Sequence, residues 1–237
     1  MIQTYSMIIW AKANQEDFKV TVDKAYRLLK ALKDYGSEFS PNYLPAYHKK
    51  DAKQYDLSYE TLEILIQKGR NKEGNRVFPD LGYHVSFFSA LNDDDSAGIS
   101  LTIGMSNPKF INSFVVHFPI SLNIFDDNAT EKLIYLFKKS ILIFDPFWGC
   151  ISSSLNQQRL GPFYENDKPK RVHWVNFWDM NTIRSITEEK IKKAPLYSIE
   201  KIDAKGYILI LEKKPFDDND EADVKLQNEV DKILGLN

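Results

Sequence analysis

The feature that most constrains the fold is the segment RVHWVNFWDM at residues 171–180. Successive side chains of a β-strand point to opposite faces of a sheet. In a strand, Trp174 and Trp178 would share one face, whereas His173 and Phe177 would share the other. Both faces are largely apolar and aromatic, which favours a central strand covered on both sides. We therefore expect the chain to build a sheet around this segment.

Patterns typical of helices and of strands alternate along the rest of the chain. Helical spacing of apolar residues predicts helices at residues 15–35, 59–67, 131–144 and 224–234, with a weaker helical piece at 187–193. Strand-like runs occur at residues 5–10, 83–91, 97–104, 113–120, 147–153, 197–203 and 207–213, and residues 37–57 and 155–170 are predicted to be irregular. Turn-rich linkers between the strands favour antiparallel hairpins. We expect an α+β fold with a mostly antiparallel sheet, helices packed against it, and a single domain over residues 1–237.

Charge and cysteine usage narrow the class of protein. The formal net charge of −2 gives no overall attraction to nucleic acid or to an acidic membrane. Cys150 is the only cysteine, which excludes an internal disulfide and fits a reducing compartment. The first residues lack a basic segment followed by an apolar one, and no run approaches the ~20 apolar residues of a membrane-spanning helix. A cytoplasmic protein without a membrane partner is expected.

Motifs for catalysis and cofactor binding are missing from the sequence. There is no Gly-x-Ser-x-Gly turn, no Walker loop and no Gly-x-Gly-x-x-Gly turn. Cys150 lies in a predicted strand beside apolar residues, where a buried, inert thiol is the expected state. The histidines lack the spacing of a metal site: His48, His84, His117 and His173. The acidic run at residues 217–223 is not an EF-hand, because Ala222 stands where that loop needs glycine. No catalytic residue, metal or cofactor is therefore predicted.

One enzymatic alternative stays open. Two carboxylates and a lysine can hold a metal ion and activate water, and Asp80, Glu212 and Lys214 could supply them in a metal-dependent hydrolase or nuclease. Direct binding of nucleic acid is not expected, because the lysines near aromatic residues are scattered and the chain is slightly acidic.

Clusters of acidic residues and exposed tyrosines are the best candidates for binding a protein partner. Acidic turns can mimic phosphates and steer a basic partner into place. The candidate residues are Asp93, Asp94, Asp95, Asp126, Asp127, Asp217, Asp218, Asp220, Glu221, Tyr43 and Tyr47, with Tyr55 as a further exposed tyrosine. The alternative interpretation is that aspartate is simply favoured in turns and helix N-caps. The four tryptophans are expected to pack in the core rather than at an interface: Trp10, Trp148, Trp174 and Trp178.

Short motifs spread over nearly the whole chain point to a family. In order they are GSEFSPNY at 36–43, PDLG at 79–82, IG at 103–104, NS at 112–113, FDPFWG at 144–149, VHWVNFW at 172–178, GYILI at 206–210 and PF at 215–216. This layout resembles the immunity protein 52 family of bacterial polymorphic toxin systems. The resemblance implies a cytoplasmic α+β protein that binds and occludes a cognate toxin, usually one with a restriction-endonuclease-like nuclease domain. It implies no cofactor and no catalytic residue. An adaptor without a toxin partner remains a further alternative.

Overall fold

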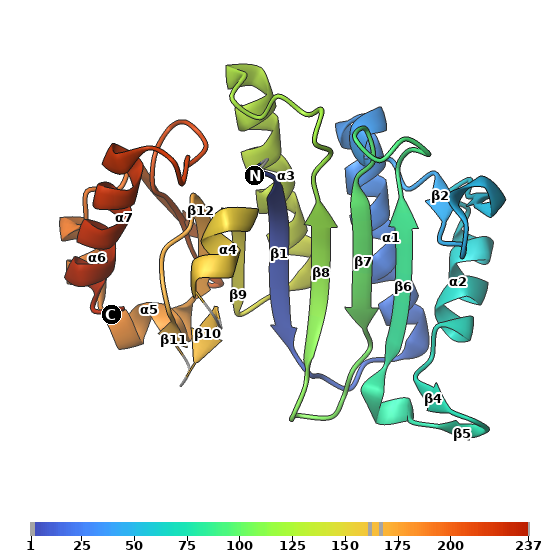
Figure 1. The fold of residues 1–237 in the computed structure, drawn as a ribbon. Helices are drawn as coiled ribbons and strands as arrows, with labels where there is room; N and C mark the ends of the chain where they lie inside the picture. The colour runs from blue at the N-terminus through green and yellow to red at the C-terminus, as the bar shows by residue number, and fades with distance from the viewer. Residues whose placement is uncertain (1–2, 161–162, 166–167, 237) are drawn as a thin grey trace. The chain divides into compact units, whose positions relative to one another are not determined.

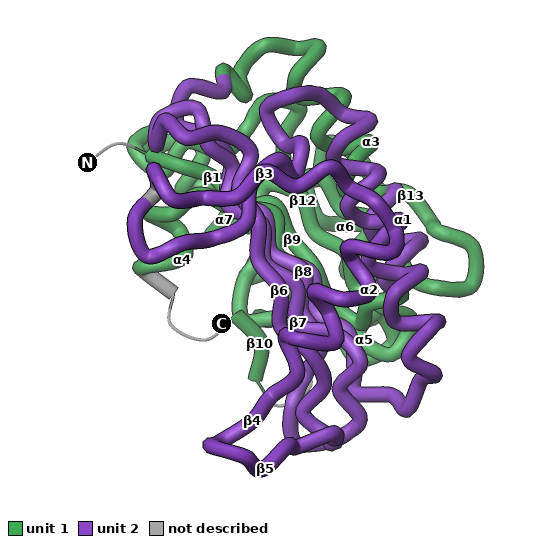
Figure 2. The backbone as a smooth tube through the Cα atoms, turned by 90° about the vertical axis from the view of Figure 1, so that its right-hand side faces the viewer, with its two compact units in different colours: residues 1–8, 123–138, 145–237 green, residues 9–122, 139–144 purple. Residues whose placement is uncertain are grey.

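The computed structural model describes residues 3–160, 163–165 and 168–236. The chain forms two compact units, which are coloured separately in Figure 2. Unit 1 contains residues 1–8, 123–138 and 145–237, and unit 2 contains residues 9–122 and 139–144. The expected α+β class with a mostly antiparallel sheet is confirmed, whereas the expectation of a single domain stays a prediction. No helix among the described residues has the length and apolar content that crossing a membrane requires.

Unit 1 is built around the aromatic segment. Its strands are β9 (Trp148–Ser153), β12 (Val175–Asp179), β13 (Ser198–Ile202) and β14 (Gly206–Ile210), in the order β13-β14-β12-β9, followed by the first residues of β1 (Tyr5–Lys12). Its helices are α4 (Ser154–Leu160), α5 (Met180–Ile186), α6 (Glu188–Lys193), α7 (Glu221–Leu234) and most of α3 (Asp127–Phe144). A separate two-stranded pair joins β10 (Tyr164–Glu165) to β11 (Lys168–Pro169).

The central strand of unit 1 is the one that the sequence predicts. β12 pairs antiparallel with both β9 and β14, and Trp178 lies opposite Trp148. Trp174, Phe177 and Trp178 have no exposed surface, so both faces of this segment are covered. The strand itself begins at Val175, three residues later than the apolar pattern starts. Trp148 is also fully buried, and these three tryptophans therefore pack in the core, as expected.

The outer strand of unit 1 is β13, which pairs with β14 on one side. Its side chains alternate between half-buried and exposed. Glu200 forms an ion pair with Lys138, and the Lys201 ammonium lies 5.9 Å from the centre of the Tyr207 ring. The strand that ends the sheet thus carries a charged residue on each of its two faces.

Unit 2 contains the predicted strand meander. Its main strands are β6 (Tyr83–Phe88), β7 (Gly98–Ile103) and β8 (Ile111–His117), joined as antiparallel neighbours. The order is β1-β8-β7-β6-β2-β3, with β2 (Tyr43–Leu44) and β3 (Lys53–Gln54) at the edge. β4 (Lys72–Glu73) and β5 (Arg76–Val77) form a separate hairpin. The helices are α1 (Phe18–Tyr35) and α2 (Tyr59–Lys68), with 3-10 turns at Ser37–Phe39, Lys49–Asp51 and Pro79–Leu81.

The sheet of unit 2 has one buried face and one half-exposed face. Val85, Leu101 and Phe114 lie on the buried face, where α1 and α2 pack (Figure 1). The neighbouring positions on the same strands, such as Ser86 and Ser100, are half-exposed. This alternation is the pattern expected when helices cover only one side of an antiparallel sheet.

Several parts of the chain differ from the sequence prediction. Residues 37–57 were expected to be irregular, but they contain the β2–β3 hairpin. Residues 155–160, also expected to be irregular, belong to α4. Helix α5 directly follows β12 and was not predicted; Asp179 caps it by accepting a hydrogen bond from the Thr182 N–H at 2.8 Å. In the rest of the stretch that was predicted to be irregular, β10 and β11 form a short antiparallel pair, while residues 161–162 and 166–167 lie outside the described residues.

Candidate functional site

The β2–β3 hairpin lies at the edge of the unit 2 sheet, beside the end of β6. Tyr43 of β2 pairs with Phe88, the last residue of β6. Their rings stack, with centroids 5.4 Å apart and planes inclined by 17°. On its other side Tyr43 pairs with Gln54 of β3. The hairpin thus extends the sheet by two short strands.

Asn42 fixes the hairpin to the rest of unit 2. Its side-chain Nδ2 donates to the carbonyl oxygen of Ser89 at 2.9 Å, and its Oδ1 accepts from the Ser40 hydroxyl at 2.8 Å. Its backbone carbonyl accepts from the Tyr55 N–H at 2.7 Å. Because both ends of the Asn42 amide are satisfied within the protein, its role here is to hold the hairpin in place.

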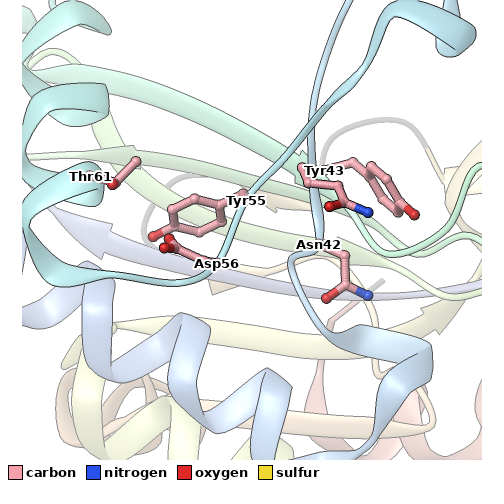
Figure 3. Close-up of a pocket in the computed structure, with 6 residues that line it drawn as sticks. Asn42, Tyr43, Tyr55, Asp56 and Thr61 are labelled. Atoms are coloured by element: carbon pink, nitrogen blue, oxygen red, sulfur yellow. The ribbon is translucent and has the colours of Figure 1, made fainter.

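A pocket of about 550 Å³ opens between this hairpin and the start of α2. It is lined by Asn42, Tyr43, Gln54, Tyr55, Asp56 and Thr61. Figure 3 shows Tyr55, Asp56 and Thr61 on the side of α2, and Tyr43 and Asn42 on the opposite side. The lining combines aromatic rings, amides, hydroxyls and one carboxylate, so the pocket offers hydrogen-bonding groups beside aromatic surface.

Asp56 and Thr61 are positioned by the N-terminus of α2. Ser58 caps this helix, its hydroxyl oxygen accepting a hydrogen bond from the Thr61 N–H at 3.2 Å. The Ser58 N–H in turn donates to Asp56 Oδ1 at 3.0 Å. The carboxylate of Asp56 is therefore held at the pocket by one oxygen.

Tyr55 is a correction to the sequence prediction, which took it for an exposed tyrosine. Only 6% of this residue is exposed, and its ring stacks on Phe87 with centroids 4.9 Å apart. Burial raises the pKa of the Tyr55 phenol, and the nearby Asp56 carboxylate raises it further. Tyr55 thus contributes a neutral hydroxyl at the pocket and packs as part of the core.

Tyr47 and Tyr43 differ in their surroundings, although both were predicted to contact a partner. Tyr47, in the connection between β2 and β3, is 97% exposed and touches the ring of His48 edge-on, with centroids 4.7 Å apart. Tyr43 is half-buried at the pocket. Tyr47 is thus an exposed aromatic side chain, and large aromatic side chains often dominate interface energetics.

The acidic turn of unit 2 follows the same end of β6. Asp93, Asp94 and Asp95 lie between β6 and β7 and are all exposed. Asn92 donates to Asp95 Oδ2 at 2.7 Å, and the carbonyl oxygen of Asp94 accepts from the Ser121 N–H at 2.9 Å. The turn is thus held by local hydrogen bonds while its carboxylates face solvent. Figure 1 shows it at the same end of the sheet as β2.

Two of the predicted acidic residues in unit 1 act at the start of α3. Asp126 accepts a hydrogen bond from the Ala129 N–H at 3.0 Å, as a helix cap does. Asp127 lies 3.8 Å from the Lys213 ammonium. Both residues are exposed to solvent. Asp126 therefore caps the helix without being buried.

The acidic segment at residues 217–221 was expected to be an exposed binding surface, and for Asp218 that is wrong. Asp218 is 5% exposed and accepts a hydrogen bond from the Ser153 hydroxyl. Asp217 accepts from the Asn219 N–H at 2.9 Å, and Asp220 caps α7 by accepting from the Ala222 N–H at 2.8 Å. Glu221 is exposed. The segment is thus largely part of the fold.

The contribution of Asp218 can be measured by substitution. Asp218→Ala is expected to lower the free energy of unfolding by about 2 kcal/mol, because the buried Ser153 hydroxyl loses a carboxylate acceptor. Glu221→Ala is the matched control, because Glu221 lies only three residues further along the chain but is exposed. It should change stability by less than about 0.5 kcal/mol. Urea unfolding followed by tryptophan fluorescence measures both. Equal effects of the two substitutions would contradict the structural role of Asp218.

The residues of the enzymatic alternative lie in different units. Asp80, in unit 2, accepts a hydrogen bond from Asn107 at 2.7 Å. Glu212 and Lys214 belong to unit 1, and burial together with Asp223 raises the pKa of Glu212. No group of three or more His, Cys, Asp or Glu side chains that could hold a metal ion occurs within the part of the chain that is described.

Two buried groups with potential reactivity are found in the core of unit 1. Cys150 is fully buried, and burial raises the pKa of its thiol. His173 is 1% exposed, and its Nδ1 lies 2.9 Å from the Ser152 hydroxyl. Burial lowers the pKa of His173 to about 3, with the Arg171 charge lowering it further. The histidine is therefore neutral at physiological pH.

Comparison with known proteins gives a match to a solved structure. No protein-family model matches the sequence, and no curated protein matches it. The fold is similar to that of the Pseudomonas aeruginosa T6SS protein PA0821, with a TM-score of 0.66 and 10% sequence identity. The likeness covers 99% of this chain and 76% of that one. The two proteins share a fold.

Proposed function

We propose that this protein is an immunity protein, which binds a cognate bacterial polymorphic toxin and occludes the toxin's active or substrate site. The proposed toxin carries a nuclease domain of the restriction-endonuclease-like type. The observation that carries the proposal is the fold similarity to a T6SS protein over 99% of the chain. The short motifs that resemble the immunity protein 52 family, among them residues 144–149 and 172–178, point in the same direction.

The surface proposed for toxin binding is the end of unit 2 formed by the acidic turn, the pocket and Tyr47. Three exposed carboxylates on one turn, Asp93–Asp95, present negative charge to a domain that must itself bind nucleic acid phosphates. Tyr47 offers a protruding aromatic anchor. Charge would speed encounter and select the partner, whereas the aromatic contact would contribute most of the affinity.

Co-expression with the product of the adjacent gene tests the function. We expect a stable one-to-one complex on size exclusion, loss of nuclease activity in the complex, and growth of a host that otherwise dies when the toxin is expressed. An adjacent gene that encodes no toxin domain, or a toxin that remains active at a molar excess of this protein, would contradict the proposal.

The acidic turn can be tested separately from the fold. Asp94→Lys is expected to weaken toxin binding about tenfold, chiefly through a slower association rate, and to reduce the dependence of that rate on salt. Its side chain makes no hydrogen bond with the described residues, so stability should hardly change. Surface plasmon resonance at several salt concentrations measures both quantities.

Glu73→Lys is the matched control for this substitution. Glu73 is an exposed acidic residue of unit 2 in β4, and Figure 1 shows the β4–β5 hairpin at the opposite end of the unit from the β6–β7 turn. Both substitutions change the net charge by the same amount. An equal loss of affinity in the two variants would remove the acidic turn as a specific contact.

A further inference from the structure

We propose that the pocket between the β2–β3 hairpin and α2 receives an arginine side chain of the protein partner. The proposal deepens the proposed function and rests on it for the identity of that partner. The chemistry of the pocket itself, however, can be tested without the toxin.

The carboxylate of Asp56 is the first reason. Its Oδ1 accepts the Ser58 N–H at 3.0 Å, while Asp56 forms no ion pair with any described residue. Oδ2 is therefore available to a donor that enters the pocket. A carboxylate that is held through one oxygen by a local backbone hydrogen bond, and is open on its other oxygen, favours a cationic donor.

The second reason is the supply of further acceptors and the lack of a competing cation. The side-chain amide of Gln54 makes no hydrogen bond with the described residues and lines the same pocket. No lysine or arginine is among the described lining residues. Lys53 precedes Gln54 in β3, and the alternation of side chains along a strand places the two on opposite faces. The negative charge of Asp56 is thus available to a cationic group of a partner.

The aromatic wall favours arginine over lysine. The Tyr43 ring stacks one face on Phe88 and is half-buried at the pocket. A guanidinium group is planar, stacks on tyrosine, and carries five N–H donors that can reach several acceptors together, whereas an ammonium is a strongly hydrated point charge. A pocket that is lined by a carboxylate, an amide and a tyrosine fits the planar group better.

Peptide titration followed by NMR tests the pocket. The probe is acetyl-Gly-Arg-Gly-amide, and the controls are the same peptide with lysine or with citrulline, which keeps the shape of arginine without its charge. We expect the arginine peptide to shift the side-chain amide resonances of Asn42 and Gln54 saturably. The lysine peptide should bind several-fold more weakly, and the citrulline peptide should cause no saturable shift.

Two variants of the hairpin region complete the test. Asp56→Asn is expected to weaken binding of the arginine peptide about fivefold, the upper end for an exposed ion pair. Asp51→Asn removes an equally exposed carboxylate of the same hairpin that does not line the pocket, and it should leave binding unchanged. Equal binding of the three peptides, the absence of a saturable shift, or an unaffected Asp56→Asn variant would each overturn the proposal.

Failure of this inference and failure of the proposed function have different signatures. A toxin complex that forms while the arginine peptide causes no shift would leave the immunity function standing and remove the pocket. Arginine binding that persists when the toxin is neither bound nor inhibited would contradict the immunity function and keep the pocket chemistry.

Discussion

Trp178→Ala is expected to lower the free energy of unfolding by about 4 kcal/mol, because it deletes a large ring from the centre of a packed core. Trp178 has no exposed surface, lies in the central strand of unit 1 and pairs with Trp148 of β9. The cavity left behind would be bordered on one side by a second buried tryptophan. Chemical denaturation followed by far-ultraviolet circular dichroism measures the loss.

Trp178→Phe separates the ring volume from the indole N–H. The Trp178 Nε1 group is buried and makes no hydrogen bond within the described chain, so phenylalanine removes an unpaired donor while keeping most of the apolar contact. We expect a cost of less than half that of the alanine substitution. An equal loss of unfolding free energy in the phenylalanine and alanine variants would contradict this expectation and would indicate that the indole N–H makes a polar interaction.

Arg171→Leu is expected to cost about 3 kcal/mol of unfolding free energy near neutral pH, since it leaves a buried carboxylate without its partner. Asp231 of α7 is fully buried and lies 2.9 Å from Arg171 Nε. The same carboxylate accepts the Val172 N–H at 2.8 Å, and Gln227 donates to the Val172 carbonyl at 2.6 Å. These contacts fasten the last helix to the segment that precedes β12.

The cost of Arg171→Leu should depend on pH. Burial raises the pKa of Asp231 from 3.8 to about 6, against the lowering effects of the Val172 N–H and of Arg171. Because the folded protein holds this proton more tightly than the unfolded chain, the stability contributed by Asp231 is fully present below pH 3.8 and is lost as the pH rises through about 6. Without Arg171 the pKa rises further and the loss grows. The substitution should therefore cost little near pH 4 and most near pH 7.

A double variant isolates the charge in this pair. The variant that combines Arg171→Leu with Asp231→Asn has no charge at either position of the pair. It should regain most of the stability that Arg171→Leu alone loses at neutral pH. Urea unfolding of both variants at an acidic and a neutral pH gives the comparison. A cost that is the same at the two pH values would assign the role of Arg171 to apolar packing of its side chain.

The helices and strands that could be predicted from the sequence are those whose own residues carry the apolar pattern or the turn signals. The covered central strand follows from the aromatic pattern at 172–178, and the meander follows from alternating strands joined by turn residues. Helix α1 follows from helical spacing alone. The β2–β3 hairpin could not be found in this way, because each strand has only two residues. The hairpin joins the sheet through the pairing of Tyr43 with Phe88, more than forty residues away.

The same distinction applies to the candidate site. Asp218 and Glu221 have equivalent sequence surroundings, and the burial of Asp218 depends on Ser153, 65 residues earlier in the chain. Tyr55 and Tyr47 are likewise alike in sequence, but Tyr55 stacks on Phe87 while Tyr47 faces solvent. The start of α5 could have been predicted from the sequence, because aspartate is favoured at helix N-caps. Asp179 caps this helix through Thr182, only three residues later in the chain.

The charged residues of β13 bear on how copies of this protein behave at high concentration. Unpaired backbone groups at the rim of a sheet invite another molecule to add a strand, which is the first step toward fibrils. Glu200 and Lys201 project from opposite faces of this strand, so a strand of a second copy that paired with β13 would lie beside charged side chains on both faces of the sheet. We therefore expect β13 to show little tendency to pair with another copy of this protein at high concentration.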